Sequence, residues 1–144
     1  MKKLALLLLV AVLLAACQPA ATPQPTPAPV EALAGSIDDL VGVWGGPHDS
    51  AQKLEFKADG TIQMFYGSGN QRDIIVEGSY TFDSGKITFP APPVAPCKDQ
   101  PATYQAYITK LVGERISLRM QVVGSDPCVD RANSLSSPFQ FNNP

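Results

Sequence analysis

The strongest constraint on the fold is a strict alternation of apolar and polar side chains. In the clearest stretch, residues 115–123, apolar side chains occupy the even positions Ile116, Leu118, Met120 and Val122. Successive side chains of a β-strand point to opposite faces of the sheet, so this period of two predicts a strand with one buried face. The same pattern recurs along most of the chain and predicts an all-β protein.

Short strands with tight turns between them predict an antiparallel meander. We expect strands at 40–45, 53–58, 61–67, 73–82, 86–89, 103–112, 115–123 and 139–141, with one helical turn near 131–135. Asp59-Gly60 is a strong signal for a two-residue hairpin turn. Exposed sheet edges are a liability, and closure removes them. The pattern therefore favours a small up-and-down β-barrel or half-barrel of about eight strands, with a two-sheet sandwich as the alternative.

Three short motifs resemble lipocalin and lipocalin-like domains. The strand Gly42-Val43-Trp44 is similar to the Gly-x-Trp opening of that family. The hairpin of residues 54–62 and the strand start Gly78-Ser79-Tyr80 are similar to the family's next recurrent elements. The resemblance covers roughly residues 38–122. It implies a barrel whose closed end is plugged by Trp44, with Arg119 or Arg131 laid over the indole ring.

The amino-terminal end predicts export. Lys2 and Lys3 precede an unbroken apolar run, Leu4 to Leu14, which is shorter than the roughly 20 residues needed to span a bilayer. A basic head, an apolar core and a small-residue end are typical of a secretory signal. The run closes with Leu14-Ala15-Ala16-Cys17, which resembles the lipobox of bacterial lipoproteins.

This second resemblance implies cleavage before Cys17 and lipid on its sulfur. Diacylglycerol on the thiol, usually with a further acyl chain such as palmitate on the new amine, gives stable membrane anchoring. The expected location is the outer face of the cell membrane, or the outer membrane, facing the periplasm or the exterior. The alternative is an ordinary signal peptide that happens to end in cysteine.

These patterns divide the chain into three regions. Residues 1–16 are the expected signal peptide, 17–36 the lipidated cysteine and a linker, and 37–144 the β domain. The linker repeats proline in an Ala/Thr/Gln background, which removes backbone donors and favours an extended, disordered spacer.

Cys97 and Cys128 form an even pair in an exported chain. Such a pair predicts a disulfide, because oxidising compartments preserve one. A metal site is the alternative, but two cysteines without a neighbouring histidine lack a ligand set.

Two hypotheses compete for the function of the domain. In the first, the inward face lines a pocket for a small apolar ligand, with Phe56, Met64, Tyr66, Tyr80, Phe82, Leu118 and Met120 as the lining. In the second, these groups fill a small core, and the domain is a structural or inhibitor-like protein that binds another envelope protein. A domain of this length favours the filled core.

Catalysis, cofactors and nucleic acid are not expected. His48 is the single histidine, and its neighbours Asp49 and Ser50 are typical of a polar turn rather than a catalytic triad. Loss of Lys2 and Lys3 takes the formal charge from −2 to −4, so the mature chain has no basic surface for nucleic acid.

Overall fold

A computed structural model describes residues 26–46, 51–68, 71–91 and 97–142. Its elements are β1 (Val30–Leu33), η2 (Ile37–Asp39), β2 (Gly42–Gly45), β3 (Gln52–Phe56), β4 (Thr61–Ser68), β5 (Gln71–Ser79), β6 (Thr81–Asp83), β7 (Lys86–Phe89), β8 (Ala102–Leu111), β9 (Glu114–Val122), α2 (Val129–Leu135) and β10 (Phe139–Asn142). The all-β prediction is confirmed, and α2 covers the expected helical turn. Cys17 and His48, about which the sequence made predictions, lie outside the described residues.

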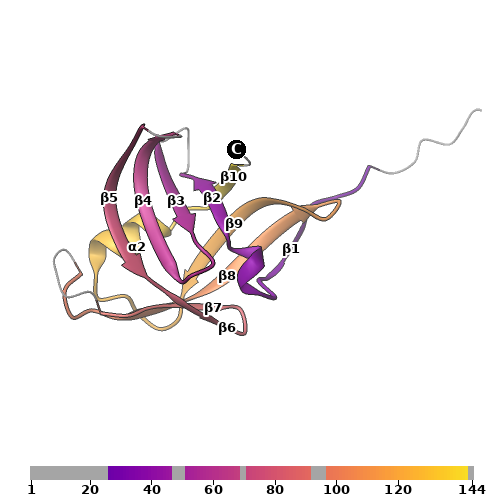
Figure 1. The fold of residues 1–144 in the computed structure, drawn as a ribbon. Coiled ribbons are helices and arrows are strands. Elements are labelled where there is room, and N and C mark those ends of the chain that lie inside the picture. The colour runs from indigo at the N-terminus through magenta and orange to yellow at the C-terminus, as the bar shows by residue number, and fades with distance from the viewer. Residues whose placement is uncertain (1–25, 47–50, 69–70, 92–96, 143–144) are drawn as a thin grey trace, which may run out of the picture.

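The strands form a single antiparallel sheet of ten strands (Figure 1). Its main path runs β5-β4-β3-β2-β10-β9-β8-β7-β6, so the last strand of the chain lies between the first hairpin and the long β8–β9 hairpin. Trp44 of β2 is thereby paired with Phe141 of β10. The described ranges thus contain one sheet rather than the two sheets of a sandwich.

The sheet is not closed into the expected barrel. β5 and β6 are the two ends of the path, and no ladder joins them in the part of the chain that the structure describes. They are nevertheless consecutive in the chain, because only Tyr80 separates them. The sheet therefore bends round until its two end strands meet at this residue. The Tyr80 N–H donates to the Gly60 carbonyl at 2.8 Å, and its hydroxyl donates to the Lys57 carbonyl at 2.8 Å. These bonds hold the junction against the β3–β4 turn.

Part of the region that the sequence assigns to the extended linker joins the sheet instead. Residues 30–33 form β1 and pair with Tyr107–Lys110 of β8. β7 pairs with residues 102–105 of β8, and β1 continues along the same edge after it. Arg119 donates two hydrogen bonds of 2.9 Å to Glu31, which fastens β1 to the sheet.

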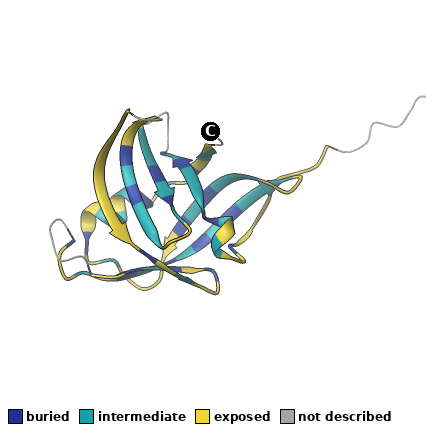
Figure 2. Ribbon diagram, in the orientation of Figure 1, coloured by how far each residue is buried: buried dark blue, intermediate teal, exposed yellow. Residues whose placement is uncertain are grey.

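The core lies on the concave face of the sheet, where large side chains from opposite strands meet. Its fully buried members include Leu40, Trp44, Leu54, Phe56, Ile87, Leu118 and Phe139. The rings of Phe56 and Tyr80 pack edge to face, with centroids 5.0 Å apart. Figure 2 shows buried positions along β3, β8 and β9, whereas β5 is exposed along its whole length.

Candidate functional site

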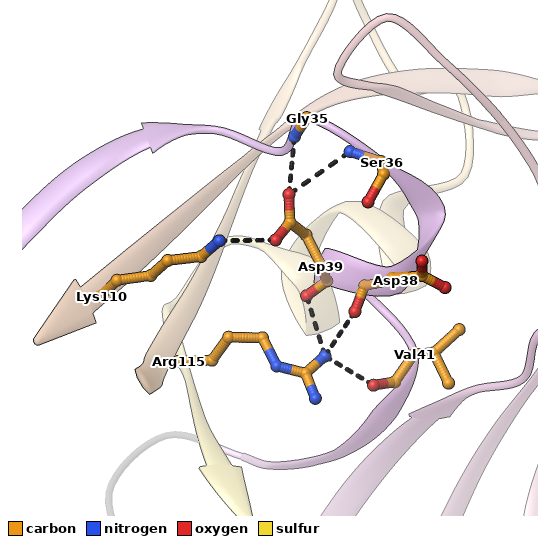
Figure 3. A network of polar contacts seen from close by, with 7 residues as sticks. All are labelled: Gly35, Ser36, Asp38, Asp39, Val41, Lys110 and Arg115. Carbon is orange, nitrogen blue, oxygen red and sulfur yellow. Dashed lines mark hydrogen bonds and ion pairs between the residues drawn. The ribbon is translucent and has the colours of Figure 1, made fainter. Parts of the chain in front are cut away.

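One polar cluster lies around η2, just before β2 begins, and Figure 3 shows its network of hydrogen bonds. Arg115 links this cluster to Trp44. The indole N–H donates to the Leu40 carbonyl at 2.7 Å, which satisfies this buried polar group. The guanidinium carbon of Arg115 lies 4.1 Å from the centre of the Phe141 ring and 5.8 Å from that of Trp44. A cation held over aromatic faces in this way is attracted by their quadrupoles.

Arg115 also ties the chain around η2 to the sheet. Its Nη1 donates to the carbonyls of Val41 at 2.6 Å, Asp38 at 2.8 Å and Asp39 at 3.2 Å. The carboxylate of Asp39 accepts hydrogen bonds from Lys110 Nζ and from the Gly35 N–H, each at 2.7 Å. Burial alone would raise the pKa of Asp39, but the hydrogen bonds from Lys110, Gly35 and Ser36 and the charge of Lys110 together leave the pKa below its usual value.

Neither arginine predicted from the sequence lies over Trp44. Arg119 stacks on Tyr107 at 4.1 Å, and Arg131 lies 6.0 Å from the centre of the Phe89 ring. The prediction of Arg119 or Arg131 is therefore wrong, and Arg115 has this place. The physical reason is the pairing of β10 with β2 and β9, which brings the start of β9 against the Trp44–Phe141 pair.

The structure shows why β2, the strand that contains Trp44, begins with a glycine, Gly42. Its φ of +135° is disfavoured for other residues, and a Cβ there would lie 2.9 Å from Cε2 of Phe141. The close approach of the Phe141 ring therefore requires glycine at this position.

A second cluster lies near the other end of β8. It joins the segment before β8, which contains Cys97 and Gln100, to the segment after β9, which contains Asp126 and Cys128. The predicted disulfide between Cys97 and Cys128 is present. Beside it, Asp126 accepts hydrogen bonds from Arg131 Nε and Nη2 at 2.7 Å each, from the Cys128 N–H at 2.8 Å, and from the Tyr104 hydroxyl. Arg131 Nη2 also donates to the Gln100 carbonyl at 2.7 Å.

The buried polar groups of this cluster satisfy one another through hydrogen bonds. The Asp126 side chain is only 1% exposed, and among the described residues no buried side-chain nitrogen or oxygen lacks a hydrogen-bond partner. Burial, followed by the hydrogen bond to Asp126, raises the pKa of Tyr104 far above its usual value. Burial would raise the pKa of Asp126 as well, but the hydrogen bonds from Arg131 and Tyr104 lower it overall. These hydrogen bonds fasten the segment around Asp126 and Cys128 to Gln100 and to β8.

The seven residues predicted to line a ligand pocket do not share one environment. Phe56, Tyr80, Leu118 and Met120 are buried in the core. Met64 and Phe82 are partly buried and pack against that core, and Tyr66 is exposed. The structure thus brings most of them together as packing partners, with only Met64 and Tyr66 near the surface along β4.

The described part of the chain shows no cluster of three or more metal-binding side chains. Over the same residues, no helix has the length and apolar character needed to cross a bilayer. Neither Arg115 nor Asp126 was predicted from the sequence as a functional residue. Arg115 lies at the start of the expected strand 115–123, and Asp126 lies five positions before Arg131 and two before Cys128.

No protein-family model matches this chain, and neither a curated protein nor a solved structure does.

Proposed function

We propose that the protein is an exported lipoprotein, anchored through Cys17, whose filled, lipocalin-like β domain binds another envelope protein without catalysis. The basic head, the short apolar run and the Leu14-Ala15-Ala16-Cys17 sequence support the anchor. Trp44 under Arg115 supports the lipocalin-like relationship.

The single cluster of buried apolar side chains is the observation that supports protein binding over ligand carriage. A pocket for a small molecule needs roughly 300–1,000 Å³ of space. Phe56, Leu118 and Met120 would line it, but they are buried against one another and their neighbours in a single apolar cluster. Among the seven predicted residues, only Met64, Tyr66 and Phe82 keep part of their surface exposed. Ligand binding therefore stays a prediction with less support.

β5 is the surface that best suits protein binding. It is nine residues long, and within the described ranges it pairs only with β4. Its centre carries three consecutive apolar residues, Ile74, Ile75 and Val76, which are 48%, 46% and 44% exposed. A strand with a free edge can accept an added strand from a partner, whose backbone then completes the ladder.

Two experiments test the two parts of this proposal. Cell fractionation of the intact chain tests the anchor: the native protein is expected in the membrane pellet, and Cys17→Ser in the soluble fraction or uncleaved. A Cys17→Ser chain that is cleaved at the same bond and stays in the pellet would overturn the anchor.

Photo-crosslinking in living cells tests the binding surface. A photoreactive residue placed at Ile75 is expected to capture one discrete partner, and the same residue at exposed Val129 of α2 serves as the matched control. The capture should disappear with Ile74→Lys, which places a charge on the same edge. Equal crosslinking at both positions, or none at Ile75, would refute the proposal for β5.

A further inference from the structure

The turn between β8 and β9 breaks a local rule of hairpin chemistry. It contains two residues, Val112 and Gly113, because Leu111 pairs with Glu114 across it. Both turn residues have positive φ, +51° and +86°. This conformation suits Asn, Asp or Gly, whereas a β-branched residue in it is a genuine outlier. Val112 is therefore strained, and it is also 78% exposed.

A second hairpin of the same chain shows that valine is not needed for this turn. Ser84 and Gly85 connect β6 to β7, where Asp83 pairs with Lys86, and their φ values of +49° and +79° are nearly the same. Ser84 is the first residue of the β6–β7 turn, the position that Val112 occupies in the β8–β9 turn. Strain that the fold does not require, at an exposed apolar residue, indicates a contact outside the domain.

The position of this turn identifies the contact. Val30, the first residue of β1, pairs with Lys110 directly beside it, so the chain enters the sheet next to Val112. Figure 1 shows the β8–β9 turn and the incoming amino-terminal segment at the same end of the molecule. Val30 is itself 64% exposed and apolar. We call residues 111–113 together with Val30 the hairpin tip.

We propose that the hairpin tip dips into the lipid interface of the membrane to which Cys17 anchors the chain. This inference rests on the proposed anchor. Thirteen positions separate Cys17 from Val30, so the tip stays within about 45 Å of the bilayer even if that segment is fully extended. A short tether of this kind gives an effective concentration in the millimolar range, so even a weak contact is well populated.

The contact is apolar rather than electrostatic. Glu114 follows the tip, and the ammonium of Lys110 is paired with Asp39 at 2.7 Å. Valine side chains at the surface of the headgroup layer gain from burial of apolar area without needing anionic lipid. The depth of the tip should therefore be the same at low and high salt.

Depth measurement in vesicles tests the proposal. The full mature lipoprotein carrying Val112→Cys, labelled with an environment-sensitive fluorophore, is reconstituted into phosphatidylcholine vesicles. The matched control is Val129→Cys, similarly exposed at 67%, which follows the end of β9 that points away from the tip. We expect a blue-shifted emission at position 112, and markedly stronger quenching by nitroxide-labelled lipids there than at position 129.

Each other outcome has a defined meaning. Equal quenching at the two positions in a chain that remains in the membrane pellet overturns the tip contact and leaves the anchor standing. A native chain that is absent from the membrane pellet overturns both. A blue shift at position 112 that appears without vesicles and grows with protein concentration indicates contact with a second protein, and it also overturns the proposal.

Discussion

Replacement of Asp126 by asparagine is the sharpest test of how the domain is held together. The carboxylate accepts four hydrogen bonds, two of them from the Arg131 guanidinium, and its side chain is almost wholly buried. Asparagine keeps one acceptor and places an NH₂ group against the remaining donors. The positive charge of Arg131 then stays buried without its partner, which typically costs about 3–5 kcal/mol.

This loss is large for a domain of about 100 residues. Each kcal/mol shifts the Tm of such a domain by about 4–8 °C, so we expect Asp126→Asn to melt at least roughly 12 °C lower. Urea unfolding followed by fluorescence measures the loss directly, because Trp44 is the single tryptophan and is fully buried. Asp130→Asn, at an exposed position of α2, is the control and should stay within about 0.5 kcal/mol of the native chain.

The pH dependence gives an independent check. The pKa of Asp126 is lower in the folded chain than in the unfolded chain, where it is about 3.9. Its contribution is therefore complete above the unfolded value and is lost as the pH falls through the lower folded value. The stability difference between the native chain and Asp126→Asn should shrink below about pH 4. A variant within about 1 kcal/mol of the native chain, or a difference that does not change with pH, would refute this reasoning.

Four further changes have defined outcomes. Gly42→Ala should lower the free energy of unfolding by about 1–3 kcal/mol through strain and the clash with Phe141, as measured by urea unfolding, whereas Gly113→Ala meets no neighbouring atom and isolates the cost of positive φ. Cys97→Ser with Cys128→Ser should cost about 3–4 kcal/mol in the same assay, since the bond closes a loop over a sequence separation of 31; reduction of the native chain should give the same loss. Arg115→Ala should destabilise by about 2 kcal/mol, because three backbone carbonyls and two aromatic rings lose their partner, and Arg119→Ala should cost less than half of that, as compared by thermal melts. Val112→Asn should raise the free energy of unfolding by about 1 kcal/mol by relieving the turn, and an unchanged or lower value would show that Val112 is not strained.

The local strand pattern was readable from the sequence because alternation depends only on neighbouring residues. The strands at 61–67, 86–89 and 115–123 were expected nearly where β4, β7 and β9 lie. The failures concern contacts between distant segments. Apolar–polar alternation in residues 73–82 predicts a buried face that includes Ile74 and Val76, but β5 ends the sheet path and both side chains are exposed.

Phe65 shows the opposite failure. Alternation places it on the outer face with Glu55, where a polar residue is expected, yet it is buried. The guanidinium carbon of Arg72 lies 4.5 Å from the centre of its ring, and Arg72 is held there by an ion pair with Glu55 at 2.5 Å. A single long side chain from the neighbouring strand can thus cover an aromatic ring, which periodicity cannot reveal.

The candidate site was only partly predictable for the same reason. The Cys97–Cys128 bond followed from the number of cysteines and the expectation of export, and Trp44 followed from a motif. The partner of Trp44 depends on the register of β10 against β2 and β9, which no local pattern encodes. The β1 strand depends on a free stretch of β8 and on the Arg119–Glu31 pair, 88 positions apart.

Native mass spectrometry of the full chain, purified from its own membranes and released from detergent in the gas phase, decides whether the protein is a lipid-anchored domain with a filled core. We predict the mass of residues 17–144 with one disulfide and covalent acyl groups at Cys17, and no further bound small molecule. A chain without covalent lipid, or a stoichiometric non-covalent ligand that leaves only on activation, would contradict this picture of the protein.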